Sequence, residues 1–114
     1  MRKKTKKAIH PQVRVGGFDY KVKFTKLTPE RNGFQPVGLI DFDDRTISLD
    51  PRYITDEEVY FSLFHEIIHA SIEACVVNYS VKDINDDKLI HPLSRILWDG
   101  LKSAGIVDKK WMKR

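Results

Sequence analysis

Two histidines four residues apart are the feature that most constrains this chain. Residues 65–69 read His-Glu-Ile-Ile-His, in the middle of a stretch that we expect to be helical. Four residues advance an α-helix by little more than one turn, so the imidazoles of His65 and His69 project from one face. They can share one metal ion there, and Glu66 can reach a water held by that ion. The motif therefore predicts a helix with one face open to a cleft.

The residues around the motif predict where this helix begins and what it buries. Thr55 and Glu58 form a capping box, which indicates a helix from about residue 56 to about residue 77. The polar residues 62, 65, 66, 69 and 73 fall on a separate arc, so we expect the motif to face away from the apolar stripe. The buried stripe is expected to contain Leu63, Phe64, Ile67, Ile68, Ala74 and Cys75.

Short apolar runs on either side of the motif predict the rest of the fold. Strands are expected at residues 13–15, 18–24, 38–42 and 46–49. Gly16-Gly17 is typical of a tight hairpin turn, and residues 43–45 form a second turn. A second helix is expected from about residue 86 to residue 104, with Gly105 as its stop signal. We therefore predict an α+β domain in which a small, mainly antiparallel sheet of three or four strands packs on two helices.

Composition places the chain among single-domain proteins without a membrane span. Its 114 residues suit one hydrophobic core, and 41% hydrophobic residues are enough to fold it. No apolar run reaches about 18 residues, and no apolar segment follows the basic N-terminus as in a secretory signal. Cys75 is the single cysteine, which favours a reducing, cytoplasmic compartment and a small core residue over a nucleophile.

The net charge of +4 comes from the ends of the chain. Without its nine terminal basic residues, the chain has 11 basic residues against 16 acidic ones. We interpret residues 1–10 as a basic flexible tail, and residues 11–114 as one domain. The alternative is a weak contact between the tails and nucleic acid. The nine residues are Arg2, Lys3, Lys4, Lys6, Lys7, Lys109, Lys110, Lys113 and Arg114.

A catalytic zinc ion usually takes three protein ligands and keeps one position for water. The candidates after His69 are Glu73, Asp83, Asp86, Asp87 and His91. Glu73 lies one turn further on the same helix and points nearly parallel to His69, so a ligand from a second, crossing helix is favoured. Asp86, Asp87 and His91 remain as candidates.

The segment from Leu63 to Ala70 resembles the active-site helix of gluzincin-type metallopeptidases. The closest likeness is to small phage and bacterial members, namely the minigluzincin, ImmA/IrrE-like and SprT-like groups. The resemblance covers about residues 37–104 and includes the two short strands before the helix. It implies a zincin-like domain in the cytoplasm of a bacterium or phage-infected cell. In such proteins a strand borders the cleft, and a peptide or protein substrate adds alongside it.

The resemblance also implies a third ligand. Gluzincins use a Glu about 20 residues after the second His, with a small residue three positions later. This chain has His91 and Ser94 at those places, and SprT-like proteins likewise use a third His. We therefore predict His65, His69 and His91 as zinc ligands and Asp87 as the alternative, with Asp86 as a helix cap.

The apolar pattern of the second helix argues against His91 as a ligand. His91 points away from the apolar side of this helix, which is centred on Leu89, Leu93, Ile96, Leu97 and Leu101. Pro92 resolves the conflict if it begins the helix or kinks it.

The resulting expectation is a zinc-dependent metallopeptidase in which Glu66 acts as general base. Three alternatives stay open: a zinc-binding regulatory or structural domain without turnover, a DNA-associated SprT-like protease, and an amidase acting on a non-protein amide. Trp98 is expected to pack rather than to bind. The donors that could stabilise an oxyanion are Tyr53, Tyr60, Tyr79 and Arg95.

Overall fold

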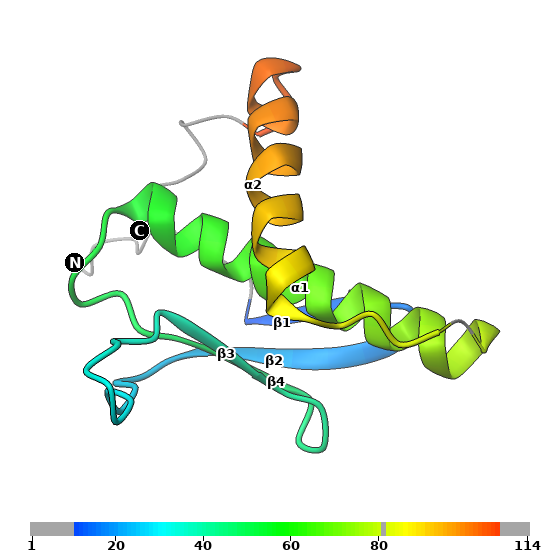
Figure 1. Ribbon diagram of the computed structural model, residues 1–114, viewed down its shortest axis with the longest axis horizontal. Coiled ribbons are helices and arrows are strands. Elements are labelled where there is room, and N and C mark those ends of the chain that lie inside the picture. Colours follow the sequence, from blue (N-terminus) through cyan, green and yellow to red (C-terminus); the bar gives the residue numbers. More distant parts are fainter. Residues whose placement is uncertain (1–10, 81, 108–114) are drawn as a thin grey trace, which may run out of the picture.

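A long helix packs on a small sheet, and a second helix crosses the long helix on the side away from the sheet (Figure 1). The computed structural model describes residues 11–80 and 82–107. The predicted basic tail over residues 1–10 and the basic residues 109–114 lie outside the described residues. The elements are β1 (Gln12–Val15), β2 (Phe18–Phe24), β3 (Gly38–Asp41), β4 (Thr46–Leu49), α1 (Asp56–Tyr79) and α2 (Asp87–Ser103).

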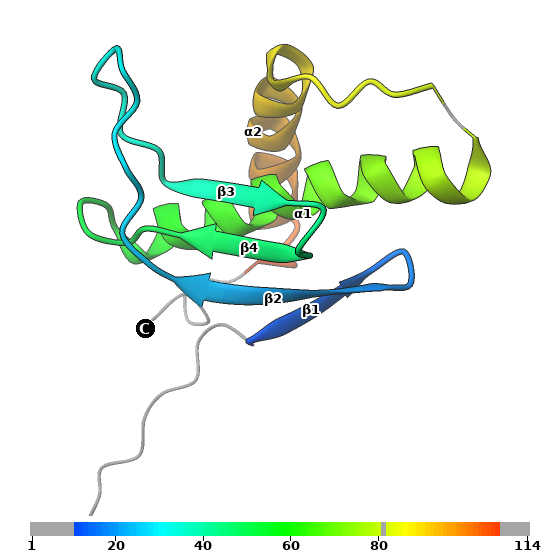
Figure 2. The same ribbon diagram turned by 90° about the horizontal axis from the view of Figure 1, so that it is seen from below.

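The four strands form one mixed sheet in the order β1-β2-β4-β3. The pairs β1–β2 and β3–β4 are antiparallel hairpins, whereas β2 and β4 are parallel. The loop over residues 25–37 leads from β2 to the far edge, so that β4 returns between β2 and β3 (Figure 2). The predicted α+β class with a small sheet and two helices is therefore confirmed, and the sheet is mixed because the loop separates the two hairpins.

The turn of the first hairpin has the conformation that its two glycines predict. Gly16 and Gly17 have φ values of 59° and 86°, and a two-residue hairpin of type I′ requires positive φ at both positions. The side-chain amide of Asn78 donates to the carbonyl of Gly16 at 3.1 Å. This hydrogen bond ties the turn to the end of α1.

Helix α1 begins where the capping box predicted and ends two residues later than expected. The Thr55 hydroxyl accepts a hydrogen bond from the backbone N–H of Glu58 at 3.2 Å. Acidic residues at 56–58 lie in the first turn, where the helix dipole favours negative charge. The helix ends at Ser80, which takes a left-handed conformation with φ 54°.

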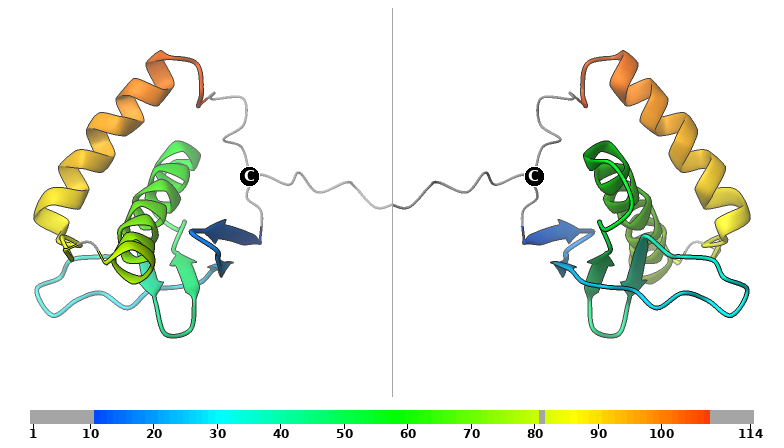
Figure 3. Two further views of the ribbon diagram at one scale, coloured as in Figure 1. Left: turned by 90° about the vertical axis from the view of Figure 1, so that its right-hand side faces the viewer. Right: turned by 90° about the vertical axis from the view of Figure 1, so that its left-hand side faces the viewer.

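Packing on two sides explains the apolar pattern of α1. One side contacts the sheet and the other contacts α2, so α1 lies between them (Figure 3). Leu63, Ile68 and Ala74 are buried as predicted, but Cys75 is exposed, so its assignment to the core is wrong. A helix that is covered from two sides has apolar residues on more than one face. The sequence pattern was interpreted as a single apolar stripe, and Cys75 was placed on it. The residues buried between the sheet and α1 are Tyr20, Val22, Ile47, Leu49, Val59, Leu63 and Ala70.

Helix α2 buries a different face from the one its leucines indicate. Ile90, Ser94 and Trp98, spaced by four residues, are its buried residues, whereas Leu89, Ile96 and Leu97 are exposed. Trp98 packs edge-on against Phe61 with ring centroids 5.6 Å apart, which confirms its packing role. Ser94, one turn before Trp98, is also buried, and its side chain is small.

The termini of α2 match the sequence closely. The Asp86 carboxylate caps the helix by accepting from the backbone N–H of Lys88 at 2.9 Å, which confirms its predicted role. Pro92 lies inside α2 rather than at its first position. Gly105 has φ 78° just beyond the end of the helix. None of the helices formed by the described residues has the length and apolar character needed to cross a membrane.

A buried carboxylate fixes the loop that leads into β3. Asp50 accepts hydrogen bonds from the backbone N–H of Leu27 at 2.9 Å and the side-chain amide of Gln35 at 3.2 Å. Arg52 pairs with the same carboxylate at 2.8 Å. The hydrogen bonds from the Arg52 side chain and the Leu27 backbone lower the pKa of Asp50 well below its usual range. The backbone of Asp50 also donates to the carbonyl of Val37 at 2.7 Å, so the residue sets the position of the edge strand.

We predict that Gly16→Ala destabilises the protein more than Gly17→Ala does. Both substitutions place a side chain at positive φ, which costs about 1–2 kcal/mol. A Cβ at Gly16 would lie 2.3 Å from the Cβ of Ala74, while nothing lies within 4 Å of one at Gly17. Overpacking of this kind adds about 1–3 kcal/mol. Urea denaturation followed by circular dichroism measures both variants, and equal losses would contradict the contact with Ala74.

We predict that the stability difference between the wild type and Asp50→Asn depends on pH. A carboxyl with a lowered pKa in the folded state stabilises it above the unfolded pKa, and this contribution fades as the pH falls toward the folded value. The difference in melting temperature should therefore be constant near neutral pH and shrink below about pH 4. Thermal melts at about pH 7 and about pH 3 test this. A difference that is as large in acid as at neutral pH would rule out the ionised carboxylate as its source.

Candidate functional site

Three side chains of the kind that bind metals converge where α2 begins above α1. His65 and His69 come from α1, and Asp87 is the first residue of α2. One potential ligand atom from each lies within 4.8 Å of the others. Asp87 Oδ1 is 2.8 Å from His69 Nε2 and 3.4 Å from His65 Nε2. The structure thus joins the two predicted histidines to the predicted alternative for the third ligand.

Local structure on both helices produces this arrangement. The four-residue spacing on α1 brings the rings of His65 and His69 to a centroid distance of 4.9 Å. The cap at Asp86 starts α2 so that Asp87 faces these rings from the opposite helix. The histidine side chains are 14% and 13% exposed, whereas that of Asp87 is 78% exposed. The site is therefore buried on its α1 side and open on its α2 side.

Asn85, which the sequence reasoning missed, fixes the orientation of His69. Its side-chain oxygen lies 2.6 Å from His69 Nδ1, and its side-chain amide donates to the backbone carbonyl of His69 at 3.0 Å. The second bond sets which end of the amide is oxygen, so Nδ1–H of His69 donates to it. A metal-binding imidazole commonly has such an acceptor at its other nitrogen. The sequence pointed to Asn85 only by its position, as a polar residue two positions before Asp87.

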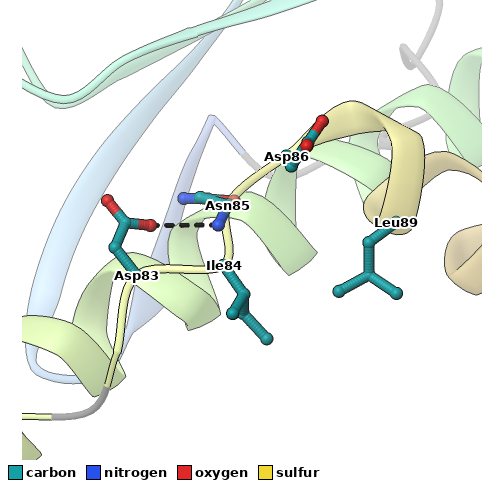
Figure 4. Close-up of a pocket in the computed structure, with 5 residues that line it drawn as sticks. All are labelled: Asp83, Ile84, Asn85, Asp86 and Leu89. Atoms are coloured by element: carbon teal, nitrogen blue, oxygen red, sulfur yellow. Dashed lines mark hydrogen bonds between the residues drawn. The ribbon is translucent and has the colours of Figure 1, made fainter.

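The loop that carries Asn85 is held by its own hydrogen bonds. The Asp83 carboxylate accepts from the backbone N–H of Asn85 at 3.0 Å (Figure 4). Ile84 and Leu89 extend to one side of this loop, and Asp86 extends to the other (Figure 4). A hollow of about 460 Å³ lies at this place, but neither a histidine nor Asp87 is among the described residues that line it.

Both ring nitrogens of His69 face side-chain oxygen atoms. Nδ1 faces the Asn85 oxygen and Nε2 faces the Asp87 carboxylate, so both ring nitrogens meet acceptors. A neutral imidazole has only one N–H, so it can donate to only one of these two oxygens. Burial, followed by the charge of His69, lowers the pKa of His65 and favours its neutral, metal-binding form.

Asp87 is kept ionised by its neighbours. Burial by itself would raise the pKa of Asp87, but the hydrogen bond to His69 and the charges of His69 and His65 together lower it. An ionised carboxylate opposite two imidazoles is a common donor set for zinc. The residues present therefore fit a divalent cation.

Glu66 lies beside this cluster rather than within it. It is 7% exposed, and its carboxylate lies next to the place that a side chain on Gly38 of the edge strand β3 would occupy. Burial is the main cause that raises the pKa of Glu66 to about 7. A carboxyl group with that pKa can accept and release a proton near neutral pH, which a general acid–base requires.

His91, the predicted third ligand, lies near the cluster but outside the group of three. Its ring centroid is 5.6 Å from that of His65 and 6.3 Å from that of Phe61. His91 follows Asp87 by four residues on α2, so both face the same cleft. Its role as ligand stays a prediction, while Asp87 occupies the nearer position in the structure.

A cleft of about 860 Å³ runs past these residues between β3 and the start of α2. Its lining includes residues 38–40 of the edge strand β3, the histidines at 65, 69 and 91, Asp87 and Arg95. Of the donors proposed for an oxyanion, Arg95 lines the cleft, and the three tyrosines are not among its described lining residues. The Arg95 guanidinium lies 3.8 Å over the Phe61 ring and 3.6 Å from the Glu58 carboxylate.

Comparisons of the chain with family models, curated proteins and solved structures find no match. The resemblance to gluzincins therefore stays a prediction.

Proposed function

We propose that this protein is a zinc-dependent metallopeptidase. The observation that carries the proposal is the meeting of His65, His69 and Asp87 beside the buried carboxylate of Glu66. All four residues line one cleft. Metal ligands from one helix and a third from a crossing element, with an adjacent acid, are the requirements of zinc-assisted hydrolysis.

His65, His69 and Asp87 would hold the metal, with His91 as the competing third ligand. Asp87 is favoured because its oxygen already lies within hydrogen-bond distance of His69 Nε2. Asn85 would keep Nε2 of His69 directed at the metal by accepting from Nδ1. When bound, zinc would lower the pKa of a coordinated water and polarise the substrate carbonyl.

Glu66 would act as the general base and then as the general acid. Its carboxylate accepts a proton from the attacking water and passes it to the leaving amine. Arg95, which lines the same cleft, is the candidate donor to the developing oxyanion.

The edge strand indicates an extended peptide as substrate. β3 pairs with β4 on one side, and its other side borders the cleft. An extended peptide can pair with such an edge through main-chain hydrogen bonds. We include the cytoplasm as the place of action in this proposal, since a lone cysteine agrees with a reducing compartment.

We predict that Glu66→Gln keeps zinc and loses hydrolysis. Glutamine preserves the shape of the side chain but cannot accept the proton, and general acid–base catalysis contributes about 10²–10⁴-fold. Cleavage of a mixed library of unstructured peptides, read by mass spectrometry, measures the loss. Asp99→Asn is the control, because it removes an exposed carboxylate that is not among the lining residues of the cleft, and it should retain most of the activity. Full activity in Glu66→Gln would refute this mechanism.

We predict about one zinc ion per chain, held less tightly after Asp87→Ala. The loss in affinity should exceed the about 10–100-fold effect of removing a residue that only orients a ligand. Competition with a chromophoric chelator measures it, and Asp99→Ala serves as the control because Asp99 is an exposed acid on the same helix. If His91→Ala releases zinc while Asp87→Ala retains it, the third ligand is His91.

A further inference from the structure

The edge strand has no side chain at the point where it passes Glu66. Gly38 is the first residue of β3 and pairs with Leu49 of β4. A Cβ built on Gly38 would lie 3.0 Å from Glu66 Oε2 and 3.4 Å from Glu66 Cγ. On its other side it would lie 3.4 Å from a methyl carbon of Leu49. A methyl group at this position would therefore be confined between two neighbours.

Backbone conformation does not explain this glycine. The glycines with positive φ are Gly16, Gly17, Gly33 and Gly105, and Gly38 is not one of them. An alanine could adopt the conformation of Gly38 without strain, and it would reduce the freedom of the unfolded chain. The close approach of Glu66 is the feature that sets Gly38 apart.

The Glu66 carboxylate has little space into which it could move. Glu66 is 7% exposed, and protein interiors are packed too densely to absorb an added methyl without movement. A Cβ at 3.0 Å from Glu66 Oε2 would be closer than almost all Cβ contacts in proteins, so Glu66 would have to shift by a few tenths of an ångström. That shift would change the direction of the carboxylate in the cleft.

We propose that Gly38 is a positioning residue for Glu66. Its missing side chain allows the carboxylate to lie against the strand, at the edge along which an extended peptide would run. The catalytic meaning of this contact rests on the proposed peptidase function, whereas the contact itself does not.

The contact is tested in zinc-free protein by a double-mutant cycle on thermal stability. Gly38→Ala is made in the wild type and in Glu66→Ala, where the carboxylate is gone. We expect Gly38→Ala to raise the melting temperature in Glu66→Ala, because alanine restricts the unfolded chain, and to raise it less or lower it in the wild type. The contact with Leu49 is present in both backgrounds and cancels. Gly100→Ala, at an exposed glycine with nothing within 4 Å, should act equally in both.

Kinetics test the positioning role. Gly38→Ala should lower kcat roughly tenfold, because small displacements of a reacting group are costly. KM and zinc content should stay as in the wild type, and Gly100→Ala should leave kcat unchanged. An equal effect of Gly38→Ala on melting temperature in both backgrounds would overturn the proposal, as would an unchanged kcat. If the wild type cleaves no peptide, the peptidase function fails, and the stability cycle still decides whether Gly38 and Glu66 are coupled.

Discussion

Helix α1 is buried from two directions, and this double burial determines where everything else lies. Leu63 and Val59 pack toward the sheet, while Phe61 packs with Trp98 of α2. Apolar area is removed from water on both sides, so the helix cannot rotate without exposing one set of contacts. The arc that remains between the sheet and α2 carries His65, Glu66 and His69. The cleft is thus a consequence of how the helix is packed.

The two carboxyl groups at this arc have pKa values shifted in opposite directions. Burial of Glu66 raises its pKa to about 7, while the neighbouring Asp87 is kept ionised by His69 and His65. The pKa values of these two carboxyl groups thus shift in opposite directions, because burial dominates at Glu66, whereas the hydrogen bonds and charges of His69 and His65 outweigh burial at Asp87. This separation of roles is a recurring property of sites that transfer protons.

Features with a local cause were predictable from sequence. The Gly-Gly turn, the Thr55 cap and the Asp86 cap depend on residues within a few positions of one another, and each lies where predicted. The helical wheel failed at Cys75 and on α2 for a common reason. A wheel locates the most apolar side, but the buried side is the one that meets a partner. On α2 that side carries Ile90, Ser94 and Trp98 rather than the leucines.

The sequence by itself determined that His65 and His69 share a face and that Glu66 follows the first of them, because helix geometry alone sets their spacing. It also indicated four strands and two helices, since alternation and capping are short-range signals. Only the tertiary structure decided that Asp87 comes nearest to both imidazoles, that Asn85 orients His69 and that Glu66 rests on Gly38. Each of these contacts joins segments at least 16 positions apart, and their relative placement follows from the packing of α1 against the sheet and α2.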